Sequence, residues 1–265
     1  MTHTKTSTMK GVWADAEAYE PYIGRWSRPV ARQLVEWVGV HGEWLDVGCG
    51  TGAVSEAIVE WSPGSRVVAL DRSEGYIAYA TRLLAGRPVR FVHGDALEIA
   101  FDDDRFDAVA SGLVLNFLSD APRAVAGMAR VARRGGALAA YVWDYAGGMG
   151  FLRAFWDVAH EIDPTAVSLD EARRSPLCAP QPLAELFRSA GLHEVSTRAI
   201  EVETHFASFD DLWRPFLGGQ GTVGSFVMRL PEAQRNEIRD RLWRKVGKGR
   251  IELRARAWAV KGLKP

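Results

Sequence analysis

Apolar and polar positions divide residues 43–143 into alternating strand-like and helix-like segments. Apolar runs at 44–47, 66–70, 89–92, 106–111 and 136–143 have the length and composition of buried strands. Apolar residues at helical spacing follow the first and second of these runs, and a helix capped by Ser119 or Asp120 with Pro122 in its first turn precedes the fifth. Strands separated by helices predict right-handed βαβ units and a parallel sheet covered on both faces.

Beyond Trp143 the pattern is less regular. Helical periodicity predicts helices over 151–162, 183–190 and 231–246. Around Ile200 and Ile251, apolar residues alternate with charged ones, which is typical of antiparallel strands with one polar face. These two strands bring the expected total to seven. The fold class we expect is therefore α/β, with a doubly wound, mostly parallel seven-stranded sheet and helical insertions.

Composition limits the kinds of partner. The chain has 265 residues, a formal net charge of zero and 47% hydrophobic residues, which argues against disorder and against an electrostatic nucleic-acid or anionic-membrane surface. Its longest uncharged apolar stretch, 108–118, is too short to span a bilayer, and residues 1–10 show no secretory signal. The basic residues within 235–250 fit a solvated helix face.

Cysteine and histidine usage points to a reducing compartment and to no metal. Cys49 lies between two glycines of a tight loop, so a disulfide with Cys178 is improbable and a cytoplasmic location is expected. The six histidines have no partners at metal-ligand spacing, so no metal site is predicted. Ten tryptophans suggest that some aromatic rings line a ligand cavity.

The sharpest motif is LDVGCGTG at 45–52, a strand that runs through three glycines into a helix. Glycine permits positive φ and close approach of a ligand to the backbone, while the helix start presents free N–H groups. Asp71, at the end of the second predicted strand, suits a carboxylate that accepts both ribose hydroxyls of an adenosine. Asp95, after the third strand, can accept a hydrogen bond from an exocyclic amine. An adenosine site is predicted across these strand ends.

The glycine pattern alone leaves the nucleoside open. Gly48, Gly50 and Ala53 also satisfy the G-x-G-x-x-[G/A] fingerprint of dinucleotide-binding proteins. An NAD(P)-dependent oxidoreductase is therefore an alternative, although no tyrosine is followed four positions later by lysine, as in short-chain dehydrogenases. A non-catalytic module that only binds the nucleoside is a second alternative.

At these residues the sequence resembles class I S-adenosylmethionine-dependent methyltransferases, and within them the small-molecule methyltransferase type 11 group. The resemblance covers about residues 19–143, and the strand pair near the C-terminus matches the closing hairpin of that family, with one antiparallel strand. It implies an S-adenosyl-L-methionine cofactor, S-adenosyl-L-homocysteine as product and methyl transfer to a small organic acceptor. It also implies a single domain over 1–265, with covering helices in 1–42, a cofactor-binding core in 43–143, and substrate-covering insertions in 144–175 and 206–249.

Carried over by position, the resemblance assigns cofactor-binding roles along the strand ends. The methionine part would lie between the glycine loop and the end of the fourth strand, the ribose on the second strand, and the adenine between the second and third. An aromatic residue and an arginine of the N-terminal segment would fold over the cofactor. In chain order these positions are Tyr19, Arg25, Asp46, Gly48, Cys49, Gly50, Asp71, Arg72, Ile77, Asp95, Ala96, Leu97, Ser111 and Gly112. Arg72 departs from the apolar residue usual there, and its guanidinium could stack on the purine.

Methyl transfer from a sulfonium is an in-line displacement, so the protein chiefly supplies proximity, alignment and water exclusion. A general base is needed only when the acceptor carries a proton at neutral pH. We expect catalytic groups after the fourth and fifth strands, with Asp144 or Tyr145 as the preferred base and Asn116 as a third candidate. Other candidate acceptor contacts are Phe117, Trp143 and the glycine-rich turn at 216–221. The acceptor would be small and apolar or aromatic; nucleic acid and a membrane span are not expected, and a monomer and a homodimer are both open.

Overall fold

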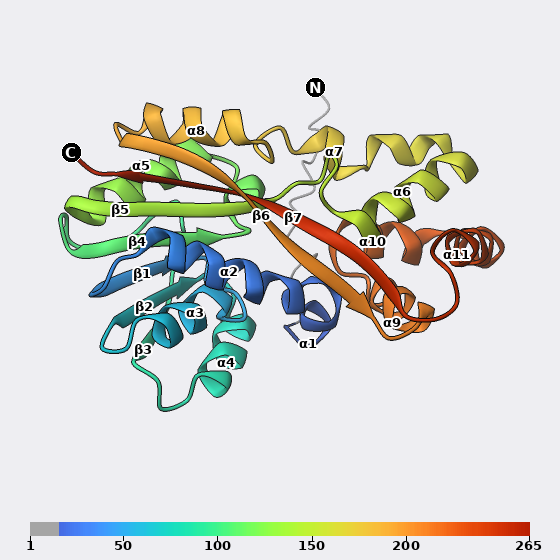
Figure 1. The fold of residues 1–265 in the computed structure, drawn as a ribbon, viewed down its shortest axis with the longest axis horizontal. Helices are drawn as coiled ribbons and strands as arrows, with labels where there is room; N and C mark the ends of the chain where they lie inside the picture. The colour runs from blue at the N-terminus through green and yellow to red at the C-terminus, as the bar shows by residue number, and fades with distance from the viewer. Residues whose placement is uncertain (1–15) are drawn as a thin grey trace, which may run out of the picture.

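The computed structural model describes residues 16–265, which form a seven-stranded sheet with helices on both sides (Figure 1). The strand order is β3-β2-β1-β4-β5-β7-β6. Strand bounds are Glu43–Val47 for β1, Arg66–Asp71 for β2, Val89–His93 for β3, Phe106–Gly112 for β4, Ala132–Trp143 for β5, His193–Phe206 for β6 and Ile251–Leu263 for β7. Neighbouring strands pair in parallel from β3 to β5, while β7 runs antiparallel to both β5 and β6. The expected mostly parallel sheet with one reversed strand is confirmed.

Helices of the core pack on the two sides of this sheet (Figure 1). Helices α2 (Arg25–Val38) and α3 (Ala53–Trp61) contact each other, whereas α5 (Ala121–Val131) and α8 (Pro180–Ser189) lie together on the other side. Helix α4 (Glu74–Leu83) packs against β2 and β3. The apolar spacing in the sequence predicted α3, α4, α5 and α8 because their inward positions carry the core residues. Asp120 caps α5 as expected, but β5 begins at Ala132, four residues before the predicted start.

The chain enters the core through a short N-terminal segment. It consists of α1 (Ala16–Tyr19) and a π-helical turn, η1 (Glu20–Gly24), which runs directly into α2. The predicted covering helices in 1–42 are therefore described only from residue 16, and the rest of that prediction lies outside the described residues. Within residues 16–265 no helix combines the length and the apolar character needed to cross a membrane.

The two insertions form one helical layer beyond the carboxyl ends of the core strands, which we call the cap (Figure 1). Its elements are α6 (Gly150–Ile162), η3 (Pro164–Ser168), α7 (Glu171–Arg174), α9 (Phe209–Trp213), η4 (Arg214–Gly218), α10 (Gly221–Arg229) and α11 (Glu232–Val246). The long strands β6 and β7 reach from the core into the cap, and their last pair toward the cap joins Phe206 to Ile251. The cap thus sits at the edge of the sheet where parallel α/β folds bind ligands.

Aromatic rings fill the interior of the cap. The ring centres of Phe155 and Phe216 lie 5.2 Å apart, those of Trp156 and Phe226 lie 5.7 Å apart, and Tyr22 joins them from η1 at 5.9 Å from Phe216. All five rings are buried. This differs from the expectation that the rings line a cavity: edge-to-face packing makes them the dry core of the cap.

Candidate functional site

The glycine loop after β1 takes a conformation that only glycine adopts without strain. Backbone N–H groups of Gly48 and Cys49 both donate to the Leu70 carbonyl, at 2.7 and 2.9 Å, and so fasten the loop to the end of β2. Gly48 has φ +72°, and a Cβ there would lie 2.4 Å from Val114. The loop therefore lies close against the segment that follows β4, leaving no room for a side chain at this position.

Asp71 joins the end of β2 to this loop. Its Oδ2 accepts from the Gly50 N–H at 2.8 Å and its Oδ1 from the Ser73 N–H at 2.8 Å. The side chain is buried, which raises the pKa of the carboxyl above its ordinary value although these N–H groups oppose the shift. Gly50 has φ +52° and nothing within 4 Å of where a Cβ would point. The Gly50 residue therefore has open space on one side and the Asp71 carboxylate on the other. The remaining lone pairs of that carboxylate can accept hydrogen bonds from a ligand.

Asp46 supplies a second carboxyl, at the floor of the loop. It is 0% exposed, and its Oδ2 accepts from the Ser55 N–H at 3.0 Å and the Ser55 hydroxyl at 2.7 Å. Its Oδ1 has no hydrogen-bond partner within residues 16–265. Burial raises the pKa of this carboxyl to about 7, against the two bonds from Ser55. A buried oxygen without a donor calls for a ligand or a water that can donate.

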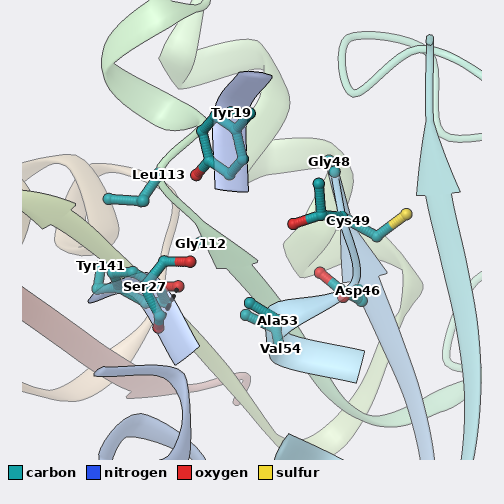
Figure 2. Close-up of a pocket in the computed structure, with 12 residues that line it drawn as sticks. Tyr19, Ser27, Asp46, Gly48, Cys49, Ala53, Val54, Gly112, Leu113 and Tyr141 are labelled. Carbon is teal, nitrogen blue, oxygen red and sulfur yellow. Dashed lines mark hydrogen bonds between the residues drawn. The ribbon is translucent and has the colours of Figure 1, made fainter. Parts of the chain in front are cut away.

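A small pocket of about 30 Å³ opens beside Asp46 (Figure 2). Its walls come from the N-terminal segment, the glycine loop, the start of α3 and the ends of β4 and β5. The lining residues are Tyr19, Ser27, Asp46, Gly48, Cys49, Gly50, Thr51, Ala53, Val54, Gly112, Leu113 and Tyr141. Six residues predicted to bind the cofactor therefore line one pocket, and Tyr19 faces the glycine loop across it (Figure 2).

The end of β4 forms the other wall. The Ser111 hydroxyl donates to the Val47 carbonyl at 2.9 Å, so it ties β4 to β1 rather than pointing into the pocket. A Cβ at Gly112 would lie 2.7 Å from the Tyr141 ring. Leu113 has φ +62°, a strained conformation for a branched side chain, and lines the pocket. Nothing in the sequence pattern pointed to Leu113 or Tyr141.

The residues predicted around the adenine lie at the ends of β2 and β3. Asp95 accepts from the Leu97 N–H at 2.9 Å, and Ala96 between them is buried. Arg72 is exposed, and Ile77 is half-buried in the first turn of α4. The structure brings these five positions to neighbouring strand ends, outside the pocket of Figure 2.

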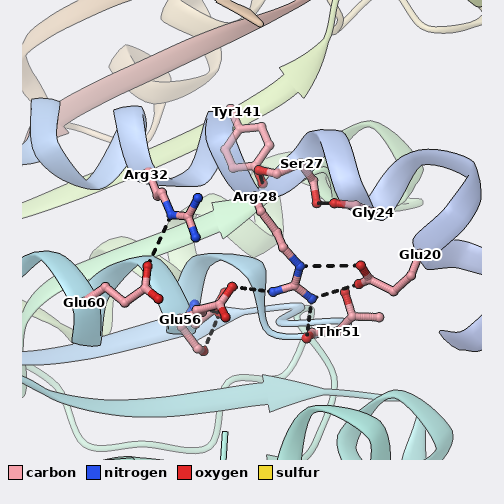
Figure 3. A network of polar contacts seen from close by, with 11 residues as sticks. Glu20, Gly24, Ser27, Arg28, Arg32, Thr51, Glu56, Glu60 and Tyr141 are labelled. Carbon is pink, nitrogen blue, oxygen red and sulfur yellow. Dashed lines mark hydrogen bonds and ion pairs between the residues drawn. The ribbon is translucent and has the colours of Figure 1, made fainter. Parts of the chain in front are cut away.

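The N-terminal segment is fastened by an arginine that the sequence analysis passed over. Arg25 pairs with Asp211 of the cap at 3.0 Å, and the structure does not place it in the pocket. Arg28 lies three residues on and contacts Glu20 at 2.9 Å, Glu56 at 2.5 Å and the Thr51 carbonyl at 3.5 Å (Figure 3). We call these contacts the Arg28 clasp. It holds η1 against α3 and the glycine loop.

The predicted catalytic residues lie around the pocket rather than in it. Asp144 is buried and accepts from the Arg256 Nε at 2.8 Å, and Tyr145 is buried with the pKa of its phenol raised by burial. Asn116 lies in the turn η2 (Leu115–Phe117) after β4, with both polar atoms of its amide buried and without a partner in residues 16–265. Among the other candidate contacts, Phe117 is exposed, whereas Trp143 and Phe216 are buried in the core.

Comparison with known proteins shows which family the sequence matches. A sequence model of the family described as "Methyltransferase domain" matches residues 45–140. The demethylmenaquinone methyltransferase of Roseiflexus castenholzii is 30% identical over 174 residues, which cover 60% of this chain and 71% of that protein.

Solved structures share the fold. A structure described as a putative methyltransferase from Bacillus halodurans superposes with a TM-score of 0.55 at 20% identity, covering 89% of this chain and 98% of that one. Phosphoethanolamine N-methyltransferase 2 of Haemonchus contortus, solved with S-adenosyl-L-methionine, gives a TM-score of 0.58 at 15% identity, covering 94% of this chain and 56% of that one.

Proposed function

The chain belongs to the class I S-adenosylmethionine-dependent methyltransferases, and on that premise we propose that the loop and pocket described above hold the donor for in-line methyl transfer to a small, apolar aromatic acceptor. Family membership makes S-adenosyl-L-methionine the cofactor and the protein an enzyme. It also removes the support for a nicotinamide-dependent oxidoreductase, which rested on the glycine fingerprint alone.

The residues at the pocket fit the donor. Asp46 has a buried oxygen without a partner, and Gly50 opens onto free space beside the Asp71 carboxylate. We assign Asp71 to the ribose hydroxyls, and Gly48, Cys49 and Gly50 to the methionine part. The same assignment gives the adenine to the strand-end positions Arg72, Ile77, Asp95, Ala96 and Leu97. When bound, the donor supplies a methyl group on an electrophilic sulfonium.

The protein's own contribution is to align the two reactants and exclude water. Tyr19 covers the pocket, and Gly112 with Leu113 closes the wall next to β4. Asn116 is the predicted catalytic residue that retains uncommitted polar atoms, so we assign it to acceptor contact. Asp144 is engaged by Arg256 and Tyr145 is buried away from the pocket, and their role as a base stays a prediction.

The acceptor class rests on two supports. Curated relatives are named for demethylmenaquinone, a quinone, and the cap that covers the strand ends is built from aromatic side chains. We therefore propose an acceptor with an aromatic or quinoid ring. The observation that carries the function is the Asp71 carboxylate held 2.8 Å from the Gly50 N–H beside the pocket.

Isothermal titration with S-adenosyl-L-homocysteine tests this assignment. We expect wild-type binding in the micromolar range or tighter and binding at least about ten-fold weaker in Asp71→Ala, because the ribose loses a charged acceptor. Glu60→Gln, an exposed carboxylate on α3, is the matched control and should bind like wild type. Equal affinity in wild type and Asp71→Ala would contradict the assignment, and tight binding without transfer to any member of an aromatic acceptor library would leave only a binding module.

A further inference from the structure

The methionine end of the donor carries two opposite charges, an α-ammonium and an α-carboxylate. Asp46 offers an acceptor for the ammonium, because the residue lines the pocket and its buried Oδ1 has no partner within residues 16–265. Arg25 does not serve the carboxylate, because its guanidinium pairs with Asp211 of the cap and does not line the pocket. The carboxylate therefore needs a hydrogen-bond donor from another part of the pocket wall.

The backbone amides of the glycine loop are already engaged. Gly48 and Cys49 donate to the Leu70 carbonyl, and Gly50 donates to Asp71. A ligand carboxylate that took these three N–H groups would break the bonds that fasten the loop to β2, and the acceptors left behind would need new partners. A side-chain donor on the opposite wall of the pocket would hold the carboxylate without disturbing the loop.

Tyr141 lies in that opposite wall. It is near the end of β5, is 1% exposed and lines the pocket together with Ser27, across from Asp46 and the glycine loop (Figure 2). A Cβ added at Gly112 would lie 2.7 Å from the Tyr141 ring and 2.8 Å from its hydroxyl oxygen, so the phenol lies directly against the backbone at the end of β4. This contact fixes the place of the hydroxyl in the pocket wall.

The Tyr141 hydroxyl has a proton that it can redirect to a ligand. It donates to the Ser27 carbonyl at 3.4 Å, which is long for an O–H···O bond. Ser27 lies within α2, where a carbonyl also accepts the helical bond from the N–H four residues further on, so this carbonyl does not depend on the phenol. Burial raises the pKa of the phenol well above its ordinary value, so the group remains a donor at neutral pH.

We propose that the Tyr141 hydroxyl binds the α-carboxylate of the donor, opposite the Asp46 oxygen that accepts from the α-ammonium. The inference deepens the proposed function and rests on it. A phenol that donates to a carboxylate forms a charge-assisted hydrogen bond, roughly twice as strong as a neutral one. Tyr141 is thereby a specificity-determining residue, because it favours a donor with an intact amino-acid end over nucleosides that lack the carboxylate.

Two matched ligands test the inference by binding alone. Isothermal titration compares S-adenosyl-L-homocysteine with its decarboxylated analogue, which keeps the adenosine, the thioether and the ammonium. We expect wild type to bind the intact ligand at least about ten-fold more tightly, the usual effect of a hydrogen bond to a charged group. In Tyr141→Phe this preference should fall to nearly one, because the ring still fills its place against Gly112 while the hydroxyl is gone. Tyr79→Phe, half-buried on α4, is the control and should keep the wild-type preference.

A third ligand separates the possible failures. 5′-Methylthioadenosine lacks the whole amino-acid end and should bind wild type and Tyr141→Phe equally; weaker binding to the variant would mean that Tyr141 only shapes the pocket, which overturns the inference. A preference near one in wild type, or the wild-type preference in Tyr141→Phe, also overturns it while leaving the donor site in place. The wild-type comparison needs no variant, so it decides the matter even if Tyr141→Phe does not fold. Failure of wild type to bind S-adenosyl-L-homocysteine overturns the proposed function and this inference with it.

Discussion

At the scale of single residues, Gly48 and Gly50 have different roles: the first is needed for packing, and the second leaves space for the ligand. Gly48 and Gly50 both have positive φ, yet a Cβ at Gly48 would collide with Val114 while one at Gly50 would meet nothing within 4 Å. The first glycine is required by packing. The second is required by the fold only for its backbone conformation, so the space beside it is available to the donor.

Alanine at these two positions should therefore give different results. Gly48→Ala should lower the free energy of unfolding by more than the roughly 1–2 kcal/mol of a left-handed conformation, because Val114 must also move. Gly50→Ala should cost only the roughly 1–2 kcal/mol of the left-handed conformation, but weaken S-adenosyl-L-homocysteine binding by at least about ten-fold. Urea unfolding and calorimetric titration of both variants check this. Unchanged affinity in Gly50→Ala would show that the donor does not pass this peptide.

Asp46 gives the stability of the protein a pH dependence. Its pKa is about 7 in the folded protein and near its ordinary value of 3.8 when unfolded, so between these values the folded state binds more protons. This contribution to stability is full below about pH 4 and is lost as the pH rises toward 7. The loss amounts to a few kcal/mol at most. Asp46→Asn should show a shallower decline in unfolding free energy between pH 5 and 7.5 than wild type, measured by urea titration. Parallel profiles in the two proteins would show that Asp46 is not protonated in the folded state.

At the scale of elements, the Arg28 clasp holds the N-terminal segment against α3. Arg28 bridges Glu20 of η1 and Glu56 of α3, with all three side chains partly buried (Figure 3). Four residues further along α2, Arg32 pairs with Glu60 of the same α3, but both side chains are exposed. The donor pocket of about 30 Å³ lies next to this segment, and Tyr19 lines it.

The two arginines provide a matched pair of substitutions. Arg28→Ala leaves two partly buried carboxylates without a partner, so we expect a loss of about 1–3 kcal/mol in unfolding free energy. We also expect several-fold weaker S-adenosyl-L-homocysteine binding, because Tyr19 is no longer positioned. Arg32→Ala should stay within about 0.5 kcal/mol and keep wild-type affinity. Equal effects of the two substitutions on affinity would argue against the clasp.

The sequence predicted the elements and the glycine loop well because their signals are local. The strand, the three glycines and the helix at 43–61 are adjacent, and Asp71 follows from the end of the next apolar run. Local signals could not predict which arginine, Arg25 or Arg28, contacts the glycine loop. The π-helical turn at Glu20–Gly24 changes the direction in which the following side chains point, and no periodicity announces such a turn.

Contacts between segments that are far apart in the chain were not predicted from the sequence, for a related reason. Tyr141 reaches the pocket by donating to the Ser27 carbonyl, and the two residues are 114 positions apart. Phe155 meets Phe216 and Phe226 only after the two insertions have packed together. The abundance of aromatic residues suggested a cavity, but composition does not tell whether rings line a space or fill it.

At the scale of the whole molecule, one ring couples the cap to the N-terminal segment. Phe216 is fully buried in η4 and contacts Tyr22 of η1 as well as Phe155 and Trp213 of the cap. Cap and N-terminal segment therefore share one apolar core above the strand ends.

Truncation of this ring should affect stability and ligand binding together. Phe216→Ala should reduce the unfolding free energy by about 3–5 kcal/mol and weaken S-adenosyl-L-homocysteine binding, because η1 loses its support. The adjacent Leu217 is 41% exposed, and Leu217→Ala should stay within about 0.5 kcal/mol. Denaturant titration and calorimetry report both quantities. Full donor affinity in a destabilised Phe216→Ala protein would show that cap and pocket are independent.

The pairing of Phe206 with Ile251 has a consequence for how such enzymes diversify. Residues 207–250 connect β6 to β7, and they begin and end next to two residues that pair directly with each other. This connection can therefore be exchanged for one of different length without changing the register of the two strands. A graft from a relative at this junction that keeps an aromatic ring at the position of Phe216, which packs on Tyr22, should preserve the donor cradle and alter which acceptor is admitted. New specificities can then evolve by swapping one closed loop of chain while the chemistry of the donor is inherited intact.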